Sequence, residues 1–455
     1  MPSIRYQRLR AADRDHVWHP FTQMHEYNQT EPLVIERGEG VMLYDVDGNA
    51  YYDAVASIWT NTLGHADPVL TQAIVDQARL VAHSTLLGQA NVPSIELAER
   101  LAQIAPGNLS HVFFCDSGAE AVEIALKMVY QYWRLCGKPE KRKFVKFADA
   151  YHGDTIGAVS VGAIDMFHAA FSELLFDTYR VPFPYCYRCP LGLAPESCSH
   201  DCLQALRELL ASHSSEIAGL IVEPVQGSAG IIPLPGDYLR EISELCRAHD
   251  VLLIVDEVAT GFGRTGAMFA CEHDGVVPDL MTIGKGLTGG YLPVAATLVP
   301  PHIYEMFLGT YAQRKTFFHG HTFTGNQLGC AVALANLAEF ERRQLLQHVN
   351  RVARVVEREL SAFRGLVHVG DIRQVGLFVG IELVRDRETR EAYAYEEQIG
   401  LRVGARCREL GLLMRPLGSV VLFIPPLAVT EEEACAMLGI LRQAIEDVTL
   451  SDAGR

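Results

Sequence analysis

Two short apolar segments constrain the fold of this chain more than any other feature. Residues 251–255 (VLLIV) are followed directly by Asp256, and residues 280–283 (LMTI) are followed by Gly284 and Lys285. Segments this short, rich in aliphatic side chains and bounded by Gly or Pro, are typical of buried strands. In an open α/β sheet, ligands bind beyond the carboxyl ends of the strands. The sequence therefore predicts a strand-end site that holds one carboxylate and one lysine.

A lysine and a carboxylate at such a site match the protein's part in pyridoxal-phosphate (PLP) chemistry. Lys285 can form an imine with a carbonyl cofactor, and Asp256 can keep a pyridine nitrogen protonated. Taken singly, a loop lysine or a turn aspartate is the commoner explanation of each residue. The joint pattern is more specific than either residue alone, and it favours the cofactor interpretation.

The composition narrows the class of protein further. The chain has 455 residues, of which 49% are hydrophobic, which is enough for a large core and two packed regions. Its 39 basic and 55 acidic residues give a formal net charge of -16, which argues against nucleic acid or an anionic membrane as partner. No segment approaches the ~20 apolar residues of a membrane helix. Eleven cysteines and an N-terminus without an apolar core predict reduced thiols and a cytoplasmic location.

One strand-to-helix turn has the residue types of an anion site. Residues 111–115 form a predicted strand, and Ser117, Gly118 and Ala119 open the long helix that follows. A helix start offers free backbone N–H groups and the positive end of the helix dipole to an anion such as phosphate. The alternative is an ordinary helix start with Ser117 as its N-cap. Together with the lysine and the acid downstream, the turn favours a phosphate site.

Longer motifs extend this pattern to a known family. Residues 256–266 (DEVATGFGRTG) and 284–293 (GKGLTGGYLP) resemble the signature of class III PLP-dependent aminotransferases, and the resemblance covers nearly the whole chain. Within this family the chain is most similar to the 7,8-diaminononanoate synthases of biotin biosynthesis. The motifs that carry this narrower similarity are WHPFTQM, SIWTNTLGH, AHSTLLG, DSGAEAVEIALKM, YHGDTIGAVSVG, HGHTFTGNQLGCA and MRPLG.

The resemblance implies an α/β architecture, the type I PLP-dependent fold of aspartate aminotransferase. A large doubly wound domain would span residues 71–344 and bind PLP. A small α+β domain would combine residues 1–70 with residues 345–455. The family also implies a homodimer whose two subunits share their active sites.

The resemblance also implies a transamination in two half-reactions. An amino donor first passes its amino group to the cofactor, and 8-amino-7-oxononanoate then takes it up to give 7,8-diaminononanoate. The alternatives are a class III omega-aminotransferase acting on another amine, such as 4-aminobutyrate or ornithine, and an aminomutase on the same scaffold. A catalytically silent binding protein is a third alternative, which the retention of Lys285, Asp256 and the phosphate loop disfavours.

The family's motifs assign roles to individual residues of this sequence. The residues expected to be catalytic are Lys285, Asp256 and Tyr151. The residues expected to bind the cofactor are Ser117, Gly118, Ala119, Tyr151, Asp256 and Lys285, with His321 and Thr322 reaching the phosphate of the neighbouring subunit. The residues expected to bind substrate are Phe21, Trp59, Tyr151, Lys285, Gly320 and Arg415.

Some of these roles are more specific than contact alone. The Tyr151 ring is expected to lie on the pyridine ring, and Arg415 to bind the substrate carboxylate in a bidentate manner, unless it forms an ordinary surface ion pair. Glu223 is expected to face the substrate, and Gln226 to help hold the ring oxygen of the cofactor.

Two positions bear on the identity of the amino donor. Most of the subgroup uses S-adenosylmethionine, and one branch uses lysine instead. Phe21 stands where most members carry tyrosine, and His321 where many carry proline. Both residues resemble the lysine branch, so the sequence favours lysine slightly and leaves S-adenosylmethionine open.

An insert with four cysteines is a weaker candidate for a metal site. Cys186, Cys189, Cys198 and Cys202 combine a C-x-x-C with a C-x-x-x-C spacing, which invites a zinc or iron–sulfur interpretation. The irregular spacing fits unmetallated thiols at a subunit contact at least as well, and aminotransferase chemistry requires no metal.

Overall fold

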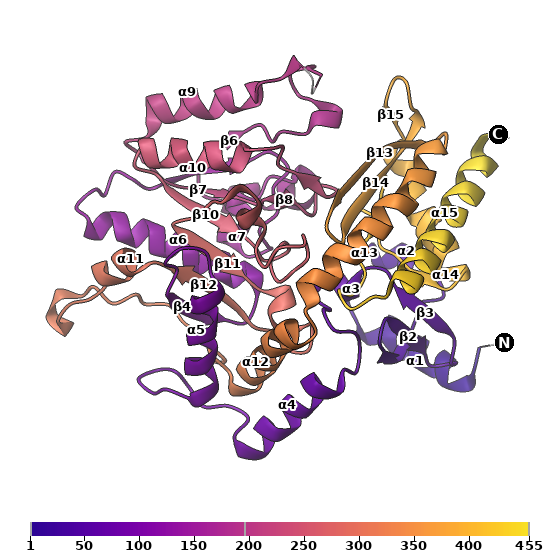
Figure 1. Cartoon of the computed structure of the whole chain (residues 1–455), viewed down its shortest axis with the longest axis horizontal. Coiled ribbons are helices and arrows are strands. Elements are labelled where there is room, and N and C mark those ends of the chain that lie inside the picture. Colours follow the sequence, from indigo (N-terminus) through magenta and orange to yellow (C-terminus); the bar gives the residue numbers. More distant parts are fainter. Residues whose placement is uncertain (1, 195–196, 454–455) are drawn as a thin grey trace.

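The structure, a computed structural model, describes residues 2–194 and 197–453. Figure 1 shows a large part built around a central sheet and, beside it, a smaller part in which the two ends of the chain lie together. Within the described residues, no helix combines the length and the apolarity that crossing a membrane requires.

The central sheet has seven strands in the order β4-β12-β11-β10-β7-β5-β6. All neighbouring pairs are parallel except those made by β12, which runs antiparallel to β4 and to β11. The strands are β4 (His111–Cys115), β5 (Lys143–Phe147), β6 (Thr178–Val181), β7 (Ile217–Val222), β10 (Leu252–Asp256), β11 (Leu280–Ile283) and β12 (Ala295–Val299). Residues 252–255 and 280–283 thus lie in strands, as predicted, and these strands are adjacent and parallel.

Both faces of this sheet are covered, as expected for parallel strands with continuous apolar runs. Along β10, Leu252 and Ile254 pack into a cluster with helix α6 (Gly118–Leu135), whereas Leu253 and Val255 pack into a second cluster with residues of α10 (Tyr238–Ala248). Successive residues of a strand point to opposite faces, so the sheet lies between two helical layers. This arrangement leaves the carboxyl ends of the strands as the place for a site.

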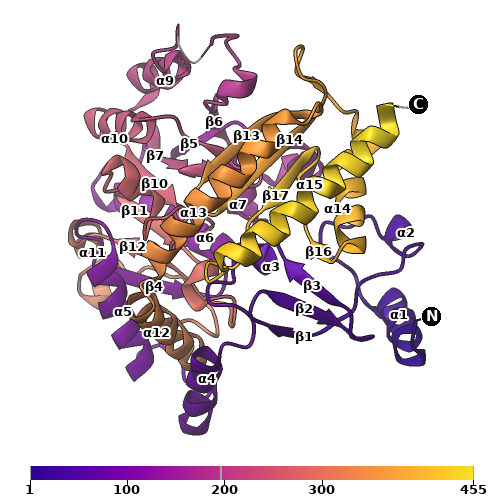
Figure 2. The same cartoon turned by 45° about the vertical axis from the view of Figure 1, so that its right-hand side comes forward.

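The ends of the chain form a second region with its own sheets. Strands β1 (Ile35–Glu39), β2 (Met42–Asp45) and β3 (Ala50–Asp53) form an antiparallel sheet, which β16 (Leu412–Leu413) extends by pairing in parallel with β3. A further sheet joins β13 (Val369–Val375), β14 (Phe378–Asp386), β15 (Glu391–Ala392) and β17 (Val420–Phe423). Figure 2 shows three long helices lying over these strands: α13 (Leu345–Leu360), α14 (Ile399–Glu409) and α15 (Glu431–Ala453).

Further helices and short strands complete the described structure. They are α1 (Ile4–His16), α2 (Met24–Tyr27), α3 (Ala56–Trp59), α4 (Pro68–Leu80), α5 (Val92–Ile104), α7 (Ile156–Val161), α8 (Asp165–His168), α9 (Gln204–His213), α11 (Pro301–Met306), α12 (Gln327–Arg342) and the short strands β8 (Val225–Gln226) and β9 (Ile232–Pro233). The expected domain boundary near residue 70 falls within α4, and the one at residue 345 falls between α12 and α13. The division into two domains at these residues stays a prediction.

Candidate active site

Four loops that follow strands of the central sheet meet at its carboxyl edge. A Cβ atom added to Gly118, after β4, would lie 2.6 Å from a methyl group of Val258, after β10. A Cβ added to Gly153, after β5, would collide with the Cβ of Ala119, and one added to Gly284, after β11, would lie 3.5 Å from Val258. The four loops that follow β4, β5, β10 and β11 are therefore in contact in the fold.

Asp256 ends β10 with both carboxylate oxygens engaged. Its Oδ2 lies 2.7 Å from Nδ1 of His152, and its Oδ1 accepts hydrogen bonds from the Thr282 hydroxyl at 3.0 Å and the Val258 N–H at 3.1 Å. The Asp256 side chain is 6% exposed. These donors fix the orientation of the carboxylate, and Oδ2 keeps a lone pair for one further donor.

Lys285 follows β11 in a conformation that its backbone does not prefer. Its φ is +40°, in the left-handed region, and its Nζ lies 5.3 Å from the centroid of the Trp59 ring. Burial lowers the pKa of the Lys285 amine, while the negative charges of Asp256 and Glu223 act in the opposite direction. A lowered pKa increases the fraction of neutral amine, which is the nucleophilic form.

The start of α6 is both capped and open to an anion. The Ser117 hydroxyl accepts from the Glu120 N–H at 3.4 Å, and Glu120 Oε2 accepts from the N–H groups of Asp116 and Ser117 at 2.8 and 3.2 Å. Within the described part of the chain, the N–H groups of Gly118 and Ala119 donate to no acceptor. The capped start expected as the alternative is present, and it leaves two N–H groups available to a phosphate.

Tyr151, Glu223 and Gln226 form a group next to Asp256. Glu223 accepts hydrogen bonds from the N–H of Tyr151 and the N–H of Gly227, each at 3.1 Å, and burial raises the pKa of its carboxyl to about 7. The Tyr151 hydroxyl donates to Asp154 at 2.7 Å, and burial together with that carboxylate raises the Tyr151 pKa. Gln226 donates to a backbone carbonyl, whereas its buried Oε1 has no partner among the described residues.

Phe21 and Trp59 are expected to form an apolar wall that contacts the substrate. The Phe21 ring, half exposed, contacts Phe167 at a centroid distance of 5.2 Å, and Phe167 in turn packs edge-on against Tyr151 at 6.4 Å. The Trp59 ring is 9% exposed and packs edge-on against Phe378 at 5.2 Å. Aromatic rings therefore approach both Tyr151 and Lys285.

Arg415 is an exposed cation on the loop between β16 and β17. Among the described residues it forms no ion pair or hydrogen bond, in contrast to the surface ion pair considered as the alternative. Leu417 on the same loop packs against the small core cluster that contains Trp59. The loop that carries Arg415 is therefore anchored next to the cluster that contains Trp59.

The segment of Gly320, His321 and Thr322 lies beside the helix α6. The Nε2 of His321 is 3.1 Å from Nε2 of His319 and 3.7 Å from the Glu120 carboxylate. Thr322 is exposed, and a Cβ added to Gly320 would meet no atom within 4 Å. The segment thus presents a hydroxyl and open backbone to the surface rather than to its own core.

The four cysteines of the insert are all free thiols. Cys186 is exposed, Cys189 and Cys198 are half-buried, and Cys202 is buried. Within residues 2–194 and 197–453, no group of three or more His, Cys, Asp or Glu side chains is placed to hold a metal ion.

His152 and Arg264 also belong to this region, although the sequence suggested no role for either of them. His152 contacts Asp256 through Nδ1, and its buried Nε2 has no partner among the described residues. Arg264 is 2% exposed and donates only to backbone carbonyls, the shortest bond being 2.6 Å to Pro425. Burial lowers the Arg264 pKa to about 9. The contacts of His152 and Arg264 could not be predicted from residue type, because they depend on segments distant in sequence being adjacent in the fold.

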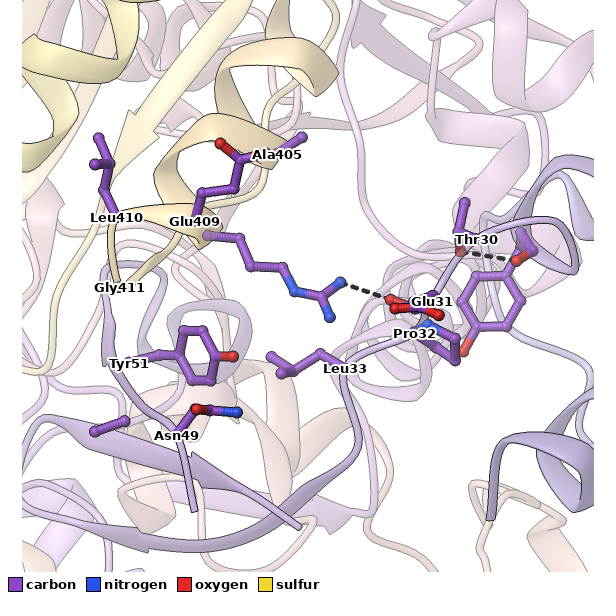
Figure 3. Close-up of a pocket in the computed structure, with 13 residues that line it drawn as sticks. Thr30, Glu31, Pro32, Leu33, Asn49, Tyr51, Ala405, Glu409, Leu410 and Gly411 are labelled. Carbon is purple, nitrogen blue, oxygen red and sulfur yellow. Dashed lines mark hydrogen bonds between the residues drawn. The ribbon is translucent and has the colours of Figure 1, made fainter. Parts of the chain in front are cut away.

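A separate cavity of ≈ 1000 Å³ lies in the smaller part of the molecule, between the segment after α2 and the end of α14 (Figure 3). Arg408 lines it and donates to the backbone carbonyl of Glu31 at 2.9 Å. None of the residues expected to bind cofactor or substrate lines this cavity, so it is separate from the meeting point of the four loops.

Comparisons with known proteins identify the family. The family Aminotransferase class-III matches residues 23–445, and the chain belongs to this family of PLP-dependent aminotransferases. It is 53% identical over 437 residues to the adenosylmethionine-8-amino-7-oxononanoate aminotransferase of Anoxybacillus flavithermus, which covers 96% of each chain. It is 51% identical over 451 residues to the protein of that name in Geobacter sulfurreducens, covering 99% of this chain and 100% of the relative.

A solved structure supports the same assignment. The crystal structure of the adenosylmethionine-8-amino-7-oxononanoate aminotransferase of Methanocaldococcus jannaschii matches with a TM-score of 0.93 and 45% identity, covering 97% of this chain and 99% of the other. The type I PLP-dependent fold expected from the sequence is confirmed.

The geometry of the site fits PLP. Two free N–H groups at the start of α6 suit its phosphate, and the remaining lone pair on Asp256 suits the proton of its ring nitrogen. The unpartnered Oε1 of Gln226 is an acceptor for the ring hydroxyl. Lys285 supplies the amine for its aldehyde.

Proposed function

We propose that this aminotransferase converts 8-amino-7-oxononanoate to 7,8-diaminononanoate, with S-adenosylmethionine as the amino donor. The observation that carries the proposal is identity of about half of all residues, over the full length, to relatives that bear this activity in their names. The same names favour S-adenosylmethionine over lysine, because full-length similarity weighs more than the two positions Phe21 and His321.

The geometry of the site supports a separate role for each of its residues. Bound PLP supplies an electrophilic carbonyl and an electron-accepting ring. Lys285 would anchor it through its amine and, once released, would act as the base that takes a proton from the substrate carbon. Asp256, oriented by His152, holds the proton on the ring nitrogen. The start of α6 would bind the phosphate, and Tyr151 would pack against the ring.

The substrate would enter between the two groups of aromatic side chains. Its apolar chain would pack against Phe21 and Trp59, and its carboxylate would pair with Arg415, whose guanidinium has no other partner among the described residues. Glu223 would face the substrate from the side of Gly227.

We also propose a homodimer with shared active sites. Leu87 is 82% exposed, Phe318 79% and Phe323 54%, and these apolar side chains lie on segments around Gly320–Thr322. Exposed apolar side chains gathered in this way mark an interaction surface. The partner's copy of His321 and Thr322 would complete the phosphate site. A cytoplasmic location belongs to the same proposal, in keeping with eleven free thiols.

A coupled assay tests the function directly. Purified enzyme receives 8-amino-7-oxononanoate with either S-adenosylmethionine or lysine, and the diamine product is measured by mass spectrometry. We expect product with S-adenosylmethionine. Product with lysine alone would change the donor, and product with neither, but turnover of 4-aminobutyrate or ornithine, would favour an omega-aminotransferase.

The role of Lys285 has its own test. Borohydride reduction of the enzyme should fix the cofactor to the peptide that contains Lys285, and Lys285→Ala should abolish both the labelled peptide and turnover. Labelling at another lysine, or full activity of the variant, would overturn the assignment.

A further inference from the structure

Four consecutive residues with side chains adopt left-handed backbone conformations. The φ angles of Ala56, Ser57, Ile58 and Trp59 are +44°, +48°, +67° and +68°. L-residues rarely enter this region, least of all β-branched ones, and such a segment persists only when its surroundings hold it. In Figure 1 this turn, labelled α3, lies between the large and the small part of the molecule.

A buried carboxylate holds the turn from within. Asp53, with its side chain 1% exposed, accepts hydrogen bonds at Oδ1 from the N–H groups of Val55 at 3.2 Å and Ser57 at 3.3 Å. Its Oδ2 accepts from the Ser57 hydroxyl at 3.1 Å and lies 2.9 Å from Nε2 of His65. One side chain thus binds the turn at two backbone positions and one hydroxyl.

The hydrogen bonds around His65 have a defined direction. Asn61 Oδ1 accepts from the Gly64 N–H at 2.7 Å, so Asn61 Nδ2 is the donor that lies 3.2 Å from Nδ1 of His65. Because Nδ1 accepts, Nε2 carries the proton and donates to Asp53. The direction therefore runs from Asn61 through His65 to Asp53.

A second set of hydrogen bonds connects Thr62, which follows the turn, with the segment directly after Lys285. The Thr62 hydroxyl donates to Oδ1 of the fully buried Asn336 at 2.7 Å. Asn336 Nδ2 in turn donates to the carbonyls of Gly286 and Leu287 at 2.9 and 3.0 Å, directly after Lys285. Arg264, whose charge also acts on Asp53, donates to the carbonyl of Asn61 at 3.4 Å.

The turn determines where the Trp59 ring lies. The ring is confined by Phe378 and by Gly227, where an added Cβ would lie 2.7 Å from it, and Lys285 Nζ is 5.3 Å from its centroid. The turn's left-handed path therefore brings the ring to the amine.

We propose that Asp53, oriented by His65 and Asn61, is a positioning residue that holds the turn and so fixes the Trp59 ring beside Lys285, thereby shaping the substrate wall. The inference rests on the proposed roles of Trp59 and Lys285. An apolar wall binds the substrate chain equally in the ground and transition states, so its displacement acts mainly on KM.

Reversing the direction of the hydrogen bonds tests the proposal. In Asp53→Asn the new amide N–H faces the N–H of His65, so the bond is lost. Adding Asn61→Asp lets His65 take its other tautomer, donate to position 61 and accept from position 53. We expect KM for the oxo acid to rise tenfold or more in Asp53→Asn, with kcat changed less than threefold, and to return near wild type in the double variant.

Fluorine NMR reports the position of the Trp59 ring independently of the kinetic measurements. The chain has three tryptophans, so 5-fluorotryptophan labelling gives three resonances, with Trp59→Phe identifying that of Trp59. The resonance should shift and become sensitive to solvent isotope in Asp53→Asn, and revert in the double variant. Asp279→Asn is the control, because Asp279 accepts from the Leu253 N–H at 2.8 Å at the opposite end of the sheet and should affect neither KM nor the resonance.

Each outcome decides the proposal. An unchanged Trp59 resonance and KM in Asp53→Asn would overturn it. If Asp53→Asn does not fold, a folded double variant with wild-type KM supports the proposal, and a double variant that stays impaired overturns it. Failure of the substrate assignment is distinguishable, because the wild type would then lack activity on the oxo acid while the resonance still responded.

Discussion

At the scale of single residues, the site depends on ionisable groups whose surroundings are largely apolar or already hydrogen-bonded. Asp256 and Glu223 lie beside Lys285, and burial opposes the charged form of the lysine and of Glu223. The negative charges of Asp256 and Glu223 act to raise the pKa of Lys285 against the effect of burial, so substitutions here have consequences that depend on pH.

Glu223 should make the stability of the cofactor-free protein fall with rising pH. Its carboxyl pKa is raised from 4.5 to about 7, chiefly by burial. The folded state thus retains a proton that the unfolded state releases, and the stabilisation, full below about pH 4.5, is lost as pH rises through about 7. The shift corresponds to about 3 kcal/mol. Urea titrations at pH 5 and pH 8 measure it.

Glu223→Gln should remove most of that difference. The single amide oxygen can accept from only one of the N–H groups of Tyr151 and Gly227, so the variant should be less stable at pH 5, but its free energy of unfolding should change little between the two pH values. Exposed Glu96→Gln serves as the control and should behave as wild type. An equal pH dependence in wild type and Glu223→Gln would contradict the assigned pKa.

Arg415→Ala should weaken the binding of 8-amino-7-oxononanoate. If the bound substrate covers the otherwise exposed guanidinium, removing this partner of the charge pair should cost ~2–5 kcal/mol, which is roughly thirtyfold to more than a thousandfold in binding. The effect should appear in KM for the oxo acid, and less in the donor half-reaction. Arg442→Ala, on the surface of α15, is the matched control. Unchanged saturation by the oxo acid would remove Arg415 from the site.

At the scale of elements, the close contact between loops requires residues without side chains. Gly118→Ala places a Cβ 2.6 Å from Val258, two residues after Asp256, and so displaces either the start of α6 or the carboxylate. We expect PLP affinity to fall at least tenfold, measured by reconstitution of the cofactor-free protein.

The matched control for Gly118 lies in another helix. Gly439 is within α15, and a Cβ there meets no atom within 4 Å. Gly439→Ala should leave PLP affinity unchanged and stabilise the protein by roughly 0.5–1 kcal/mol, because alanine favours the helix. Equal loss of PLP in both variants would show that the contact with Val258 is not the cause.

Most elements could be predicted from local patterns, whereas several site contacts could not. The apolar run 280–283 coincides with β11, and β12 begins at Ala295, after Pro293, which lacks the N–H that a ladder needs. The bond between His152 and Asp256 depends on strand order, because β7 separates β5 from β10. The left-handed turn at Ala56–Trp59 contains no glycine, so the sequence carried no signal for it.

At the scale of the whole molecule, the proposed shared site allows two inactive subunits to form one active site. Thr322→Glu should place a carboxylate against the phosphate bound by the partner and inactivate the homodimer. A heterodimer of this subunit with Lys285→Ala contains one site with an intact lysine and an intact Thr322. Affinity-purified heterodimers carrying two different tags should therefore show about half of the wild-type activity per dimer.

The same experiment can reject the arrangement. If Thr322 serves its own subunit, both sites of the heterodimer are defective and no activity returns. The two parent homodimers, purified in the same way, give the background rate.

The parallel pairing of Leu412 with Tyr52 in β16 and β3 joins the two ends of the chain in one sheet. During synthesis, the N-terminal hairpin emerges first and keeps an exposed edge until almost the entire polypeptide has left the ribosome. Contacts between residues so far apart in sequence are slow to form, and unpaired edges favour aggregation. A ribosome that stalls before residue 412 therefore releases a chain whose first sheet has an open edge, which makes truncated products natural substrates for chaperones and proteases.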